Sequence, residues 1–212
     1  MKTVYSFAGC VMEGAPFLSP FAPGTETSTR GMSTEGVLRL LSGESLAIEE
    51  CQLAQLRAKN HRLPDEYGRY NPVHADRLDT ILWTPVSDAV YLIPLARCPD
   101  KTVYPIHDAY LNETLGSTGA SLSYETMSAL WARLYETTAG IDRRGVVFYP
   151  TDHLIDGPWK RRIDTIQRQA HIAFSAWKPF TVEPDLAEPG GYWAHYSEAA
   201  RQKLWGEVAE WL

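Results

Sequence analysis

Apolar residues recur every three or four positions in several stretches of this chain, which is the spacing of an amphipathic helix. The clearest example covers residues 127–134, in a stretch that opens at Ser121 or Ser123 and ends at Gly140. Serine is a favoured N-cap because its hydroxyl accepts a hydrogen bond from a free N–H group of the first turn. The same reasoning predicts four further helices, which begin after Ser33, after Ser45 (to about Lys59), at Pro158 and after Ser197.

Other stretches have the alternating or continuously apolar pattern of β-strands. Residues 2–9 alternate apolar and polar positions, and residues 145–149 form a short run typical of a buried strand. The strongest signal is a pair of runs, 79–83 and 89–98, that flank the short loop 84–88. This arrangement predicts a β-hairpin, because short loops of this kind join antiparallel strands.

Predicted helices and strands alternate irregularly along the chain. A further strand is predicted at 102–111, whereas residues 171–180 fit either a strand or a continuation of the preceding helix. An irregular order favours an α+β fold over a doubly wound sheet. We therefore predict an α+β fold with a mainly antiparallel sheet, covered by the helices that follow Ser33, Ser121 and Ser197.

Length and composition indicate a single domain and limit the classes of function. The 212 residues are 44% hydrophobic, which is enough for one core, with a long loop or helical insertion around residues 43–78. No stretch approaches the ~20 apolar residues of a membrane span, so we expect a cytoplasmic protein without a membrane partner. Three widely spaced cysteines argue against a disulfide framework or a zinc cluster. A net charge of −6 argues against a free-standing nucleic-acid binder but allows a local basic patch.

Positive charge is concentrated in one part of this acidic chain, where aromatic residues are interleaved with it. Arginine binds phosphate through forked hydrogen bonds, and aromatic rings stack on bases, so this combination suits single-stranded RNA. A solvated helix face is the alternative explanation for the same charges. The predicted RNA-binding residues are Arg30, Arg143, Arg144, Tyr149, Trp159, Lys160, Arg161 and Arg162.

Short segments of the chain carry a wider resemblance. Residues 3–8 form a strand that precedes a loop and the helical stretch Thr34–Leu41, residues 91–96 contain a Pro-Leu pair, and residues 157–160 read Gly-Pro-Trp-Lys. The order of these segments resembles the RAMP subunits of CRISPR effector complexes, in particular the kind that caps the 5′ end of the guide RNA. The glycine-rich C-terminal segment of many RAMP proteins is missing. The resemblance implies a ferredoxin-like sheet and a non-catalytic subunit in antiviral defence, which holds guide-type RNA beside other protein subunits and needs no cofactor.

A metal-dependent enzyme is the first alternative. His74 and Asp76 have the H-x-D spacing with which an imidazole and a carboxylate bind Fe(II), and His153 would complete a facial triad. Arg161 or Arg162 would then hold the carboxylate of a 2-oxo acid in an oxygenase. A histidine in a surface loop explains the same pattern without a metal.

Three weaker alternatives have less support from spacing. Cys10 is a candidate nucleophile, with the pair 107–108 (His-Asp) as its base. The segment 116–119 (Gly-Ser-Thr-Gly) before a helix offers N–H groups to an anion, although a turn and a cap explain it equally well. A small acidic inhibitor or immunity-type protein that binds a basic partner protein fits the net charge. No catalytic residue is predicted, and the question of an enzyme stays open with a non-enzyme favoured.

Overall fold

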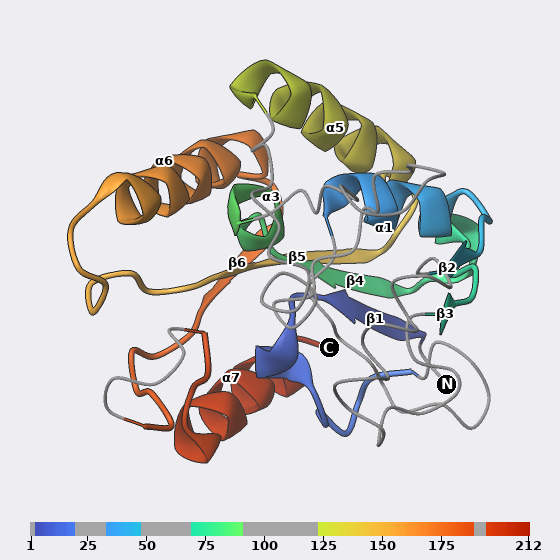
Figure 1. Ribbon diagram of the computed structural model, residues 1–212. Helices are drawn as coiled ribbons and strands as arrows, with labels where there is room; N and C mark the ends of the chain where they lie inside the picture. Colours follow the sequence, from blue (N-terminus) through green and yellow to red (C-terminus); the bar gives the residue numbers. More distant parts are fainter. Residues whose placement is uncertain (1–2, 20–32, 48–68, 91–122, 189–193) are drawn as a thin grey trace, which may run out of the picture.

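In the part of the chain that the structure describes, the central sheet has four strands, and all of them are parallel (Figure 1). The computed structural model describes residues 3–19, 33–47, 69–90, 123–188 and 194–212. The chain mixes helices and strands as predicted, but the predicted antiparallel sheet, including its ferredoxin-like form, is wrong. The strands pair in the order β1 (Val4–Phe7), β4 (Thr80–Trp83), β5 (Arg143–Phe148) and β6 (Lys178–Thr181).

The predicted hairpin is wrong at the loop 84–88. Helix α3 (Val86–Val90) begins there, directly after Pro85, whose fixed φ suits the start of a helix. The chain therefore leaves the sheet after β4 instead of turning back along it. Two short strands, β2 (Leu46–Ala47) and β3 (Arg69–Tyr70), pair antiparallel in a separate sheet. Three predicted segments lie outside the described residues: 48–59, 91–98 and 102–111.

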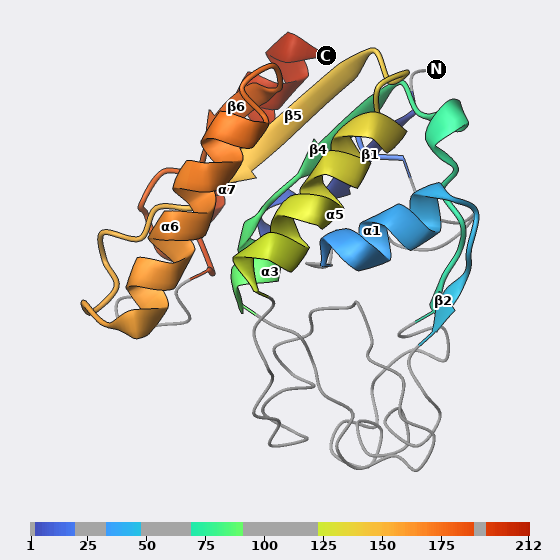
Figure 2. The same ribbon diagram turned by 90° about the horizontal axis from the view of Figure 1, so that it is seen from above.

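Helices cover both faces of the parallel sheet (Figures 1 and 2). Helices α1 (Thr34–Leu41), α5 (Tyr124–Thr137) and α6 (Pro158–Ala173) lie on one face together with α3, and α7 (Glu198–Trp211) lies on the other. None of the helices in the described ranges is long and apolar enough to cross a membrane.

The predicted serine caps at Ser33, Ser123 and Ser197 are confirmed. The hydroxyls of Ser33, Ser123 and Ser197 accept hydrogen bonds from main-chain N–H groups three residues later, at 3.4, 3.1 and 3.1 Å. The helix predicted after Ser45 is wrong at its start, because Leu46–Ala47 forms β2. Residues 171–180 contain both alternatives, since α6 ends at Ala173 and β6 begins at Lys178.

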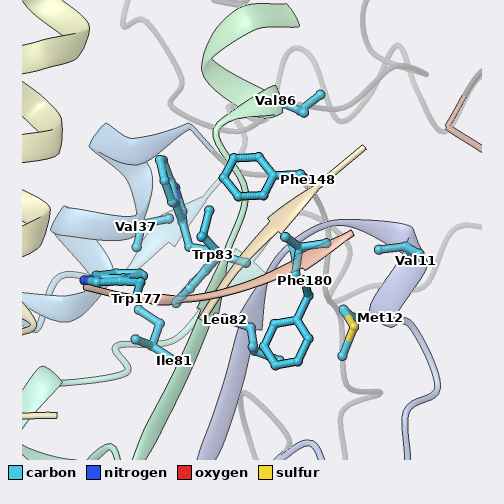
Figure 3. Close-up of a cluster of buried hydrophobic side chains, with 14 of the residues drawn as sticks. Val11, Met12, Val37, Ile81, Leu82, Trp83, Val86, Phe148, Trp177 and Phe180 are labelled. Atoms are coloured by element: carbon cyan, nitrogen blue, oxygen red, sulfur yellow. The ribbon is translucent and has the colours of Figure 1, made fainter. Parts of the chain in front are cut away.

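One cluster of buried apolar side chains, which extends over both faces of the sheet, forms the core (Figure 3). The part of it under α5 and α6 is aromatic, and there the Trp83 ring centroid lies 4.7 Å from that of Phe174. On the other face, Phe180 and Leu82 pack against Gly145, where an added Cβ would lie 2.7 Å from Leu82 Cδ2 and 3.0 Å from Phe180 Cε2. Glycine at position 145 therefore lets Phe180 approach β5 closely.

Candidate functional site

The carboxyl ends of the four parallel strands meet at one edge of the sheet, which we call the carboxyl edge (Figure 2). The helices that cross over the sheet run back against the strands, so α1, α5 and α6 begin at this edge. Open α/β sheets bind their ligands outside the carboxyl ends of the strands. Helix N-termini also carry partial positive charge, which favours an anion there.

A buried carboxylate ties three helices together at this edge. Asp88 of α3 is 1% exposed and accepts three hydrogen bonds. Thr34 at the start of α1 donates its main-chain N–H to Oδ1 at 2.8 Å and its hydroxyl to Oδ2 at 2.6 Å. Trp131 of α5 donates its indole N–H to Oδ2 at 2.9 Å. All of these donors come from the protein, so we assign Asp88 a structural role.

The electrostatics of Asp88 reflect two opposing causes. Burial raises the pKa of the Asp88 carboxyl above its ordinary value, and the hydrogen bonds from Thr34 and Trp131 counteract part of this rise. The negative charge of Glu35 raises the same pKa further. The carboxylate also lies at the N-terminus of α1, where the helix dipole favours a negative charge.

Three consecutive cationic residues stand at the start of α6: Lys160 and Arg161 in its first turn, and Arg162 directly after it. Its N-cap, Gly157, has no side chain to cap the helix, and Pro158 follows it. The main-chain N–H groups that follow Pro158 in the first turn therefore have no capping side chain from Gly157 as a hydrogen-bond acceptor. The side chain of Arg161 is 63% exposed, and its Nη1 atom lies 3.4 Å from Asp156 Oδ1.

Arg162 has a different environment from its two neighbours. Its Nε atom donates to the main-chain oxygen of Ala89, at the end of α3, over 3.0 Å. Its guanidinium lies 5.7 Å from the centre of the Tyr124 ring, at the start of α5. Arg162 thus joins α6 to α3 and α5, whereas Arg161 extends into solvent.

The chain between β5 and α6 is anchored at its beginning. Gln167 of α6 accepts from the main-chain N–H of Tyr149 at 2.7 Å and donates to its main-chain oxygen at 2.8 Å. Thr151 and Asp164 form a second link between this loop and α6. The Tyr149 hydroxyl donates to the main-chain oxygen of Ala8, after β1. The Tyr149 side chain is buried, at 5% exposure, whereas the base-stacking role predicted for it needs an accessible ring face.

The structure brings together only part of the predicted RNA-binding set. Arg143 and Arg144 lie at the amino end of β5, at the opposite edge of the sheet from the first turn of α6 (Figure 2). They also extend to opposite faces: the Arg143 guanidinium lies 5.9 Å from the Trp211 ring centre, and that of Arg144 lies 5.3 Å from the Tyr135 ring centre. Arg30 and the side chain of Trp159 lie outside the described residues.

The predicted iron ligands are also divided between the two edges. His74 and Asp76 lie just before β4, at its amino end, whereas His153 follows the carboxyl end of β5. The His74 ring packs against Gly43, where an added Cβ would lie 2.8 Å from Cε1. In the described part of the chain, no group of three His, Cys, Asp or Glu side chains could hold a metal ion.

The remaining predicted sites cannot be placed completely. Cys10 begins a short 3-10 helix, η1 (Cys10–Met12), after β1. Its predicted base at 107–108 and the predicted anion-binding segment 116–119 lie outside the described residues. The Asp88 cluster was missed from the sequence, because its members are separated by 43 and 54 residues and share no local pattern.

No protein-family model, curated protein or solved structure matches this chain. The fold and the carboxyl edge therefore define only a broad class, an open parallel α/β protein with a basic helix N-terminus at the usual ligand-binding edge. Function on such folds follows from the site and not from the fold.

Proposed function

We propose that this protein binds a phosphate group at the first turn of α6, carried either by a nucleotide or by an RNA strand. The observation that supports it best is the position of Lys160 and Arg161 on an uncapped helix start at the carboxyl edge of a parallel sheet. Main-chain N–H groups at a helix start, with cationic side chains in the same turn, suit the several oxygen acceptors of a phosphate. The long 3.4 Å contact between Arg161 and Asp156 leaves the guanidinium able to turn toward such a ligand.

The RNA part of this proposal comes from the sequence, and the fold limits how many of the predicted RNA-binding residues can contact one RNA strand. A groove that needed Arg143 and Arg144 beside Lys160–Arg162 would have to cross from one edge of the sheet to the other. Contact with RNA at the first turn of α6 alone covers a single phosphate or a few neighbouring ones. A subunit that holds one end of a guide-type RNA within a larger assembly is consistent with this small footprint.

Calorimetric titration of the full chain tests the proposal with three probes: adenosine 5′-monophosphate, a 5′-phosphorylated single-stranded RNA, and the same RNA without its terminal phosphate. The variant combines Lys160→Ala with Arg161→Ala. The control combines Arg77→Ala with Arg133→Ala, which removes the same charge from exposed positions outside the first turn of α6. We expect the first variant to weaken phosphate binding at least about tenfold, because each charge-assisted hydrogen bond contributes ~1.5–3 kcal/mol.

The outcomes separate the two sources of phosphate. Binding of the phosphorylated RNA that the variant loses and the control keeps supports the RNA part, and binding of the mononucleotide alone supports a small phosphorylated ligand. For a single-stranded RNA, losing two phosphate contacts should also reduce the magnitude of the slope of log affinity against log salt by roughly 1.4, since each contact contributes about 0.7. If no probe binds, or if the variant and its control bind equally well, the proposal is wrong.

A further inference from the structure

Helix α6 presents to solvent a row of side chains that continues beyond its first turn. Arg161 and Arg168 are both exposed and are seven residues apart, which is just under two turns of an α-helix. The two arginines therefore lie on the same side of α6, about 10.5 Å apart along its axis. Ile172, at 76% exposure, follows Arg168 one turn later on this side. We call Arg161, Arg168 and Ile172 the outer row of α6.

The charges of the outer row all have one sign. Helix α6 has four lysine or arginine residues, and Asp164 is its only acidic residue. The Asp164 carboxylate is half-buried and accepts a hydrogen bond from Thr151, so it faces the preceding loop and not the outer row. Asp156 lies 3.4 Å from Arg161, but both side chains are largely exposed, and such pairs are weak. In a chain of net charge −6, a row of this kind favours binding of a polyanion.

The surroundings of the outer row limit the width of the polyanion that fits it. On the α5 side, Glu125 and Glu136 line the groove between α5 and α6 (Figure 2). A nucleic-acid duplex or an anionic membrane is wide enough to cover α5 as well as α6, and its charges would then lie over these two carboxylates. Like charges that are brought together in this way weaken binding. A single strand can follow α6 alone, with its phosphates beside the arginines.

We propose that a single strand of RNA lies along the outer row of α6, with one phosphate at the first turn and a later phosphate at Arg168. The Arg168 guanidinium donates forked hydrogen bonds to that later phosphate, and the exposed Ile172 contacts a base beyond it. This inference rests on the proposed function, because the strand begins at the phosphate site of Lys160 and Arg161. It goes further by choosing a strand over a mononucleotide, whose phosphate cannot occupy both positions.

Calorimetric titration of the full chain tests the inference with two probes, adenosine 5′-monophosphate and a 5′-phosphorylated hexamer of uridine. The variant is Arg168→Ala, and Arg133→Ala is its matched control, because Arg133 is an exposed arginine of α5 that does not line the groove. We expect Arg168→Ala to weaken binding of the hexamer about three- to tenfold. The magnitude of the slope of log affinity against log salt should fall by roughly 0.7, the contribution of one phosphate contact to a single strand. Binding of the mononucleotide should stay unchanged.

Two further measurements keep the test independent of folding. Circular dichroism melting of Arg168→Ala checks that the fold is kept, and Arg168→Lys, which keeps the charge but not the fork, should restore the salt slope.

The possible failures have different patterns. If Lys160→Ala combined with Arg161→Ala removes binding of both probes while Arg168→Ala changes neither, the phosphate site stands and this inference is wrong. If neither probe binds, both proposals are wrong. Weaker binding of the mononucleotide to Arg168→Ala also overturns the inference, because Arg168 then contacts no second phosphate. So does an RNA duplex, or a vesicle of phosphatidylserine and phosphatidylcholine, that binds with the same dependence on Arg168, since the outer row then accepts a wide polyanion.

Discussion

Two charged side chains of opposite sign, Asp88 and Arg144, lie on the same face of the sheet and are held there by different means. Asp88 is buried and accepts three hydrogen bonds, from Thr34 and from the Trp131 indole. Arg144 instead packs against ring faces, with its guanidinium 5.3 Å from the centre of Tyr135 and 5.8 Å from that of Trp177. Its Nη1 atom is buried and has no hydrogen-bond partner in the described part of the chain.

The two environments differ in how well they replace the water that each charged side chain loses on burial. The Asp88 carboxylate exchanges water for three fixed donors, so removing it would leave those donors buried without an acceptor. Arg144 exchanges water for the negative faces of aromatic rings, an interaction that is weaker and less directional. Asp88 therefore joins α1, α3 and α5 by specific bonds, whereas Arg144 fills space at the amino end of β5. The two sites should respond very differently to substitution.

The largest expected effect is that of Asp88→Ala. Thr34 loses the partner of its N–H and of its hydroxyl, and the Trp131 indole loses its acceptor. We expect a loss of about 3–5 kcal/mol in the free energy of unfolding, the range for breaking one side of a buried charged cluster. Urea denaturation followed by tryptophan fluorescence measures it. Asp142→Ala, at an exposed position before β5, is the control and should change the stability by less than about 0.5 kcal/mol. Equal effects at both positions would contradict the structural role of Asp88.

A smaller effect is expected for Arg144→Ala, of about 1–2 kcal/mol, because two cation–π contacts and the covering of the rings are lost. Arg144→Met separates these causes, since methionine keeps much of the apolar contact but carries no charge. If covering the rings is the main contribution, the methionine variant unfolds at nearly the same urea concentration as the unmodified protein. A methionine variant as unstable as the alanine variant would show that the positive charge itself stabilises this site.

Features of the fold that depend on neighbouring residues could be predicted from the sequence, whereas features that depend on distant residues could not. Helix starts at Ser33, Ser123 and Ser197 depend on a hydroxyl and an N–H three residues apart, so a local pattern is sufficient to find them. Strand pairing depends on residues far apart in the chain, and the sheet direction was predicted wrongly. The short apolar runs inside these strands, residues 81–83 of β4 and 146–148 of β5, were a signal for parallel strands buried on both faces. The hairpin pattern of residues 79–98 indicated antiparallel strands instead, and the prediction followed that pattern.

The candidate site was predicted less completely than the fold, for a geometric reason. Arg144 and Lys160 lie 16 residues apart in the sequence, but β5 and its loop place them at opposite edges of the sheet. Only the group that shares one helical turn, Lys160–Arg162, stays together. Within this group, Arg162 already bonds to Ala89 and stacks on Tyr124, which no local pattern indicates. A cluster of charges in the sequence therefore predicts charge, but not a common surface.

The smallest effect expected is a dependence of stability on pH that separates Asp88 from Arg144. Burial raises the pKa of Asp88 in the folded protein above its ordinary value of 3.8, so the folded chain keeps this proton to a higher pH than the unfolded chain does. The unfolded chain then binds fewer protons in this window, and stability falls as the pH rises from about 3.8 through the raised pKa. Asp88→Asn cannot titrate and should remove this decrease, although it costs some stability at every pH, because an amide can accept hydrogen bonds only through Oδ1.

Urea denaturation of the unmodified protein, Asp88→Asn and Arg144→Met at several pH values between about 4 and 8 tests this expectation. The difference in unfolding free energy between the unmodified protein and Asp88→Asn should shrink as the pH rises, because only the unmodified protein becomes less stable through ionisation of this carboxyl. The difference from Arg144→Met should stay constant, since arginine keeps its charge throughout. If the Asp88→Asn difference grows with pH instead, the hydrogen bonds from Thr34 and Trp131 outweigh burial, and the carboxylate is stabilised in its charged form.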